Sequence, residues 1–76
     1  MSVRAYVLIT TAIGSEYEVL EDLKTSASTT RGVKVEADVV YGSFDLVVII
    51  EAPDLSTLDR VVTQIRSHPK ITRTTT

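Results

Sequence analysis

The sequence has no cysteine and no tryptophan, and it contains one histidine, two prolines and three glycines. Without cysteine, the fold contains neither a disulfide framework nor a thiolate metal site. A chain of 76 residues forms one domain, which we place over residues 1–76. A domain of this size buries only about 60% of the surface that its unfolded chain exposes. Since no cross-link compensates, the composition indicates stabilisation by oligomerisation.

An excess of positive charge is also missing. Eight basic residues face ten acidic ones, for a net charge of −2, and they are scattered, whereas a phosphate-binding domain gathers its cations on one face. The apolar run at 46–50 is too short to span a bilayer, and residues 1–6 lack the apolar core of a signal peptide. We therefore expect a cytoplasmic protein that binds no nucleic acid directly and no membrane.

Hydrophobic periodicity predicts two helices between four strands. The strands are expected at 3–11, 33–41, 44–51 and 71–76, and the helices at 15–26 and from about 55 to 67. Ser15 and Glu18 have the spacing of a capping box at the first helix. Leu55 begins the apolar stripe of the second helix, which continues through Leu58, Val61, Val62 and Ile65.

The connections have their own signals. Gly42 and Ser43 predict a two-residue hairpin turn with glycine first, which leaves Tyr41 on the apolar side of its strand. The segment 25–31 is rich in serine and threonine and predicts a frayed helix end and loop. Gly32 follows it, where a left-handed backbone is useful.

This order predicts an α+β, ferredoxin-like βαββαβ sandwich with an antiparallel sheet of order 4-1-3-2. The strands at 3–11 and 44–51 are the most apolar and belong in the centre, and the more polar pair suits the edges. The strand at 44–51 is apolar on both sides, with Leu46 and Val48 on one and Val47 and Ile49 on the other. Since two helices cover only one face, we expect a dimer through the remaining sheet face.

Several segments together are similar to one family. The motif Tyr41-Gly42-Ser43-Phe44-Asp45 resembles the hairpin of the effector-binding (RAM) domain of the Lrp/AsnC, or feast/famine, transcription regulators. The segments 5–9, 68–71 and 74–76 are similar to it as well, so the resemblance covers nearly the whole chain. Two departures are the longer loop at 25–31 and Lys70, which stands where glycine is common.

The resemblance implies a sensing module for transcription regulation rather than an enzyme, with no cofactor. It implies dimers joined by their sheets, rings of such dimers, and an amino acid or similar metabolite held between dimers near the hairpin. The helix-turn-helix domain of full-length members does not occur in this sequence. We therefore expect a stand-alone RAM domain or one cut from a longer parent, with a full-length regulator of the family as a further partner.

The candidate ligand-binding residues lie in two segments. At Gly42 and Ser43 the backbone N–H groups suit a carboxylate, because glycine leaves the chain bare. Asp45 suits a ligand ammonium, or alternatively accepts hydrogen bonds from the N–H groups of its own hairpin. The resemblance adds Tyr41, Thr74 and Thr76 as residues that line the pocket.

Two other functions remain open from the sequence. A small enzyme of the dimeric α+β barrel type needs a placed catalytic group, and only His68 and Asp45 qualify, in separate segments. His68 also has a simpler role as a group at a helix C-terminus, and no spacing of metal ligands accompanies it. A purely structural oligomer is the third possibility.

Overall fold

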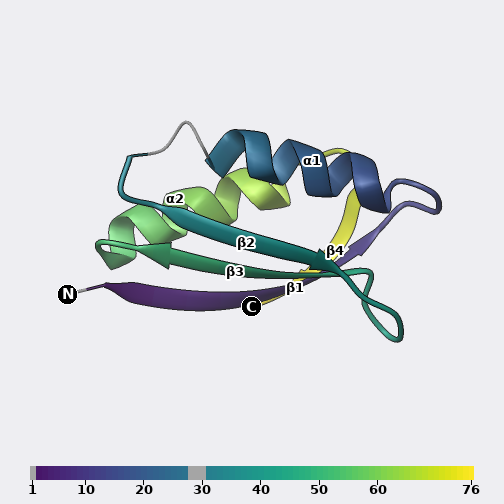
Figure 1. Ribbon diagram of the computed structural model, residues 1–76, viewed down its shortest axis with the longest axis horizontal. Coiled ribbons are helices and arrows are strands. Elements are labelled where there is room, and N and C mark those ends of the chain that lie inside the picture. The colour runs from purple at the N-terminus through teal and green to yellow at the C-terminus, as the bar shows by residue number, and fades with distance from the viewer. Residues whose placement is uncertain (1, 28–30) are drawn as a thin grey trace.

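The computed structural model describes residues 2–27 and 31–76, which form a sheet with both helices on one face (Figure 1). The elements are β1 (Val3–Thr11), α1 (Glu16–Ala27), β2 (Lys34–Val39), β3 (Leu46–Ala52), α2 (Leu55–Arg66) and β4 (Ile71–Thr75). All neighbouring strands are antiparallel and the sheet order is β2-β3-β1-β4. The predicted ferredoxin-like topology is therefore confirmed.

The core lies between the sheet and the helices. Odd-numbered residues of β1 and even-numbered residues of β3 face the helices, since Val7 pairs with Val48 and Ile9 with Leu46. The buried apolar residues are Val7, Ile9, Val19, Leu20, Leu23, Leu46, Val48, Ile50, Ala52, Leu58, Val61 and Ile65. The opposite parity, which includes Leu8, Val47 and Ile49, points away from both helices. The structure thereby settles which side of β3 meets the helices.

The helix starts differ in how they are capped. At α2, the Asp54 carboxylate accepts a hydrogen bond of 2.7 Å from the Thr57 N–H, and this bond holds the pKa of Asp54 below its usual range. The capping box predicted at α1 is wrong. The Ser15 N–H donates to the Ala12 carbonyl, and the Glu18 carboxylate accepts from Lys70 Nζ at 3.1 Å, because a cation is within its reach.

The predicted two-residue turn between β2 and β3 is also wrong. The strands end at the pair Val39 and Leu46, and the Val40 N–H donates to the Asp45 carbonyl at 2.9 Å. Residues 41–44, here called the hairpin loop, lie between them. Tyr41 consequently leaves the strand and is 98% exposed. The register is the one that a turn at Gly42 and Ser43 predicts, but regular strand pairing ends two residues before that turn on each side, so residues 41–44 form a loop instead.

The structure corrects one smaller prediction, confirms a second and covers a third in part. Leu55, the first residue of α2, is exposed, which corrects its assignment to the buried stripe of that helix. Gly32 has a φ of +81°, which confirms the left-handed position. Of the expected loop at 25–31, residues 25–27 belong to α1, and residues 28–30 lie outside the described part of the chain.

Candidate functional site

The hairpin loop projects beyond the end of the sheet, toward the side that the helices leave open (Figure 1). Tyr41, Gly42 and Ser43 are exposed and Phe44 is half-buried. Gly42 has a φ of +129°, and a Cβ built on it would have no heavy atom within 4 Å. The loop backbone is therefore open to a second molecule, and its shape depends on a conformation that favours glycine.

Asp45 fixes the base of this loop to the end of β1. Its Oδ2 accepts hydrogen bonds from the Thr11 N–H at 2.8 Å and from Thr11 Oγ1 at 3.4 Å, and its own N–H donates to the Ile9 carbonyl at 2.8 Å. The expectation that the carboxylate bonds to its own hairpin is therefore wrong, because Thr11 offers a nearly buried donor. The second oxygen, Oδ1, has no hydrogen-bond partner within residues 2–27 and 31–76.

The two threonines lie elsewhere in the sheet. Thr74 is opposite Ile9 on β4, and its Oγ1 accepts a hydrogen bond of 3.3 Å from Arg66 Nε. Thr76 follows the last residue of β4 and is exposed. Strand β1 separates both residues from β3 and its loop. One copy of the chain therefore brings Tyr41, Gly42, Ser43 and Asp45 into one segment but does not add Thr74 and Thr76 to them.

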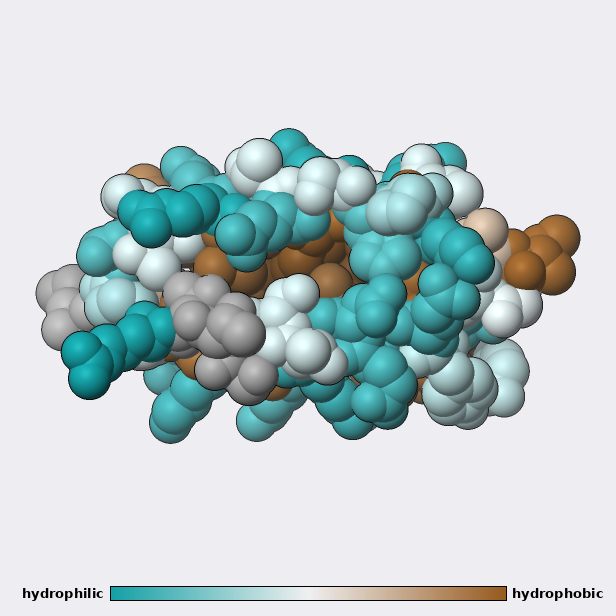
Figure 2. Space-filling view, turned by 90° about the horizontal axis from the view of Figure 1, so that it is seen from above, coloured by the Kyte–Doolittle hydropathy of each residue, from teal (hydrophilic) through white to brown (hydrophobic). Residues whose placement is uncertain are grey.

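An apolar groove runs between the two helices, where Figure 2 shows a hydrophobic floor between hydrophilic rims. The residues that line it are Asp22, Leu23, Ser26, Val33, Val35, Val61, Gln64, Ile65 and His68. None of the predicted ligand-binding residues is among them. Periodicity placed the apolar members in the core, but no sequence signal showed that the helices leave this strip of floor open.

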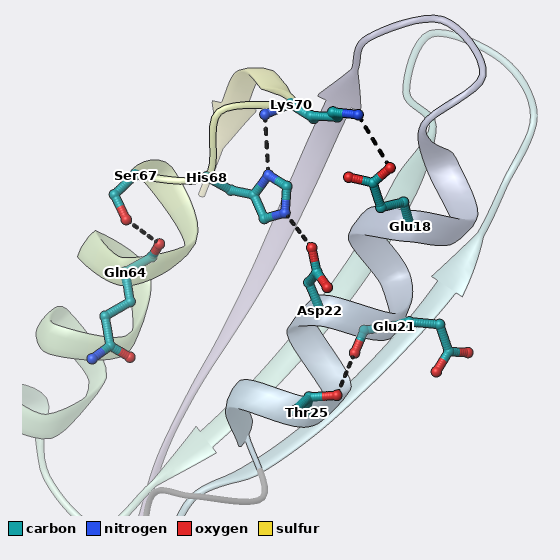
Figure 3. Close-up of polar contacts among 8 residues, drawn as sticks. All are labelled: Glu18, Glu21, Asp22, Thr25, Gln64, Ser67, His68 and Lys70. Atoms are coloured by element: carbon teal, nitrogen blue, oxygen red, sulfur yellow. Dashed lines mark hydrogen bonds and ion pairs between the residues drawn. The ribbon is translucent and has the colours of Figure 1, made fainter.

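Polar contacts join α1 to the turn between α2 and β4 beside this groove (Figure 3). His68 Nε2 lies 2.7 Å from Asp22 Oδ2, and the Lys70 N–H donates to His68 Nδ1 at 3.0 Å. A neutral ring with its proton on Nε2 satisfies both contacts. The sequence offered His68 a helix-terminal role or, in the enzyme alternative, a catalytic one, and nothing in it placed Asp22 opposite.

The sheet face away from the helices, here called the helix-free face, has an apolar centre. It is formed by Tyr6 and Leu8 on β1 and by Val47 and Ile49 on β3, which are cross-strand partners. Tyr6 is 55% exposed, and the other three are half-buried. At one end Arg4 pairs with Glu51 at 2.9 Å, and this contact holds the pKa of Glu51 below its usual range.

Within 2–27 and 31–76, no three His, Cys, Asp or Glu side chains come close enough together to hold a metal ion. In the same part of the chain, neither helix has the length and apolar character needed to cross a membrane.

Comparison with known proteins adds the family. A search of curated proteins finds no match. Residues 4–76, however, match the Lrp/AsnC ligand binding domain, which agrees with the strand order of the sheet and with the earlier resemblance at the hairpin. The chain therefore belongs to the Lrp/AsnC ligand-binding domain family.

Proposed function

We propose that this domain senses an amino acid or a similar small metabolite and works as a homo-oligomer in transcription regulation. The observation that carries the proposal is the exposed hairpin loop, anchored by Asp45, in a chain that matches a ligand-binding family over residues 4–76. Domains of this family are regulatory rather than catalytic. The proposed site consists of Tyr41, Gly42, Ser43 and Asp45, with Thr74 and Thr76 supplied by a neighbouring copy.

The chemistry of the loop suits a zwitterion. Exposed N–H groups at Gly42 and Ser43 offer donors for a carboxylate, and Asp45 Oδ1 offers an acceptor for an ammonium group. Such charge-assisted hydrogen bonds strengthen when water is excluded. In one copy the loop is open to solvent. A second copy that closes over it supplies the burial and the threonine hydroxyls.

The assembly we propose has two levels. Dimers form through the helix-free face, since its apolar centre is otherwise left to water, and rings of dimers place the hairpin loops at the contacts between dimers. A full-length regulator that carries the same domain is a further partner in this scheme. The module itself contacts neither DNA nor a membrane, requires no cofactor, and acts in the cytoplasm.

The geometry gives the enzyme alternative no support. Asp45 is bonded to Thr11 at the end of β1, whereas His68 is bonded to Asp22 on α1. The two groups that were candidates for catalysis therefore have separate structural partners. The purely structural oligomer stays as the outcome to be tested.

The test begins with a thermal-shift screen of the wild-type chain against the twenty amino acids, because a ligand that binds only the folded state raises the Tm. A hit is then measured by calorimetry with Gly42→Val. A valine is strained at a φ of +129°, so the loop must change shape. We expect loss of binding while the dimer persists.

The matched control is Gly32→Val, a second positive-φ position, at the start of β2 and away from the hairpin loop. It should cost stability without abolishing ligand binding. Unchanged affinity in folded Gly42→Val would show that the ligand binds elsewhere. If no amino acid binds the wild-type chain at millimolar concentration, the structural oligomer becomes the better account.

A further inference from the structure

The groove between α1 and α2 has an apolar floor that is open to solvent (Figure 2). The floor is formed by Leu23 on α1, by Val61 and Ile65 on α2, and by Val35 on β2 with Val33 just before that strand. Its volume is about 50 Å³. Since a cavity needs about 10–15 Å³ for each water molecule, the groove has room for a short hydrocarbon and not for a long one. Such a floor offers water few hydrogen bonds, so hydrocarbon is favoured there.

The charge beside this floor is negative. Among the described residues, those that line the groove include Asp22 and neither lysine nor arginine. His68, the other titratable residue of the lining, accepts a hydrogen bond at Nδ1 from the Lys70 N–H and is therefore neutral in this arrangement. Helix α1 is acidic as a whole, with Lys24 as its only base. Its acids are Glu16, Glu18, Glu21 and Asp22. A cation therefore complements the groove better than an anion does.

Asp22 retains a free acceptor. Its Oδ2 lies 2.7 Å from His68 Nε2, whereas its Oδ1 has no hydrogen-bond partner within residues 2–27 and 31–76. Figure 3 shows this carboxylate reaching from α1 toward His68, and the side chain is 54% exposed. Because Asp22 lines the same groove as the apolar floor, a ligand on that floor can place a hydrogen-bond donor at Oδ1.

We propose that this groove is a second binding site of the domain, which takes a short aliphatic primary ammonium ion. The hydrocarbon body lies on the apolar floor, and the ammonium group donates a hydrogen bond to Asp22 Oδ1. The site goes beyond the proposed function and does not depend on it, since it shares no residue with the site at the hairpin loop. It also lies on the opposite side of the sheet from the helix-free face, so a dimer through that face leaves it accessible.

The test is an NMR titration of the ¹⁵N-labelled wild-type chain with isobutylammonium chloride at constant ionic strength. We expect saturable shifts of the amide signals of Leu23, Val35 and Val61, with a Kd of about 1–10 mM for so small a ligand. Isobutyl alcohol and isobutyrate keep the same body and change the charge, and both should bind at least about twofold more weakly. Ammonium chloride keeps the charge without the body and should not shift these signals.

Two variants test the two parts of the site. Asp22→Asn removes the charge and keeps an acceptor for the His68 ring, so it should weaken isobutylammonium binding about two- to fivefold and remove the preference over isobutyl alcohol. Asp59→Asn, the same change at an exposed carboxylate on α2 outside the lining, should alter neither.

Val35→Phe fills the floor and should abolish binding. Its matched control is Val39→Phe, which lies on the same side of β2 and is also half-buried but does not line the groove. Dispersed amide spectra show that each variant is folded, and the Asp22→Asn result decides the proposal if Val35→Phe does not fold.

The outcomes also separate this site from the one at the hairpin loop. If isobutyrate or isobutyl alcohol binds the groove as tightly as isobutylammonium, or if no saturable shift occurs there, the proposal is overturned. Leucine has a similar body with an added carboxylate, for which the lining offers no cation, so it should bind the groove more weakly. Leucine binding there at least as tightly as isobutylammonium would overturn the amine as the ligand. Shifts at Gly42 and Ser43 report on the amino-acid site alone.

Discussion

Asp45 connects the base of the hairpin loop to β1 across 34 positions of sequence. Asp45→Ala leaves the Thr11 N–H buried without its acceptor, which should lower the free energy of unfolding by about 1–3 kcal/mol. Asp45→Asn keeps a carbonyl acceptor and should cost less. Urea denaturation measures both. Asp59→Ala, an exposed carboxylate on α2, should leave the midpoint unchanged, and an equal loss there would contradict the assigned role of Asp45.

Asp54 gives a prediction in pH. Its N-cap bond to Thr57 holds its pKa below the usual 3.8. A lowered pKa means that the contribution to stability is complete above 3.8 and is lost as the pH falls through the lower folded-state value. At pH 6, Asp54→Ala should lower the Tm by about 5 °C.

The acid series then separates wild type from variant. The difference in Tm between wild type and Asp54→Ala should shrink steadily below pH 3.8, because the protonated carboxyl is a weaker acceptor for the Thr57 N–H. Scanning calorimetry over that range is sufficient. A difference that stays constant down to pH 2 would show that the cap does not depend on the charge.

At this scale the sequence is informative about polar groups and less so about their partners. It singled out Asp45 because a carboxylate at the start of a buried strand needs hydrogen bonds. It could not find Thr11 as the donor, because that contact depends on the register between β1 and β3. Glu18 was assigned to Ser15 for the same reason, since Lys70 is distant in sequence and close in space.

Between elements, His68 holds α1 to the turn before β4. Its side chain is 14% exposed and contacts Asp22 and the Lys70 N–H. His68→Ala removes both contacts and should destabilise the domain by about 1–2 kcal/mol. Thermal or urea unfolding measures this loss.

Lys70→Ala is the matched control, since its side chain forms an exposed pair with Glu18 and its backbone N–H remains. Exposed pairs contribute at most about 1 kcal/mol, so this change should matter less than the loss of His68. If the two variants are equally stable, the polar contacts at His68 do not join α1 to this turn.

Hydrophobic periodicity predicts the strands and helices but not all of their boundaries. Alternation predicted β1 over its full length and predicted the sheet order, because the most apolar strands must be central. The hairpin was misjudged because Gly42 and Ser43 satisfy a tight-turn rule locally, whereas the regular pairing of β2 with β3 stops at Val39 and Leu46 and leaves residues 41–44 as a loop. The opening between the helices depends on the packing of α1 and α2, which periodicity does not encode.

For the whole molecule, two neighbouring residues of β3 test the two sides of the sheet. Val48 is fully buried against the helices, so Val48→Asp places a charge in the core and should unfold the chain. Val47 lies on the helix-free face, so Val47→Asp should keep the fold and abolish the dimer. Circular dichroism and sedimentation distinguish the two results.

Val47→Thr, nearly equal in volume, is the milder companion and should weaken the dimer less than the aspartate. A Val47→Asp chain that remains dimeric would show that the helix-free face is not the interface. At this scale the sequence predicted an apolar sheet face that the two helices leave uncovered, since β3 is apolar on both sides. The structure was needed to say that this face includes Val47 and excludes Val48.

The order of the strands in the sheet also affects how the chain is made. Strand β1 is central, yet its neighbours are β3 and β4, so the segment that leaves the ribosome early must wait for segments that leave late. At about 5–20 residues per second, β1 stays without β4 for several seconds. During that time a strand with apolar residues on both sides is exposed in the nascent chain, which is the condition under which chains aggregate. The apolar residues on both sides of β1, which suit it to the centre of the finished sheet, therefore favour aggregation while the chain is being synthesised.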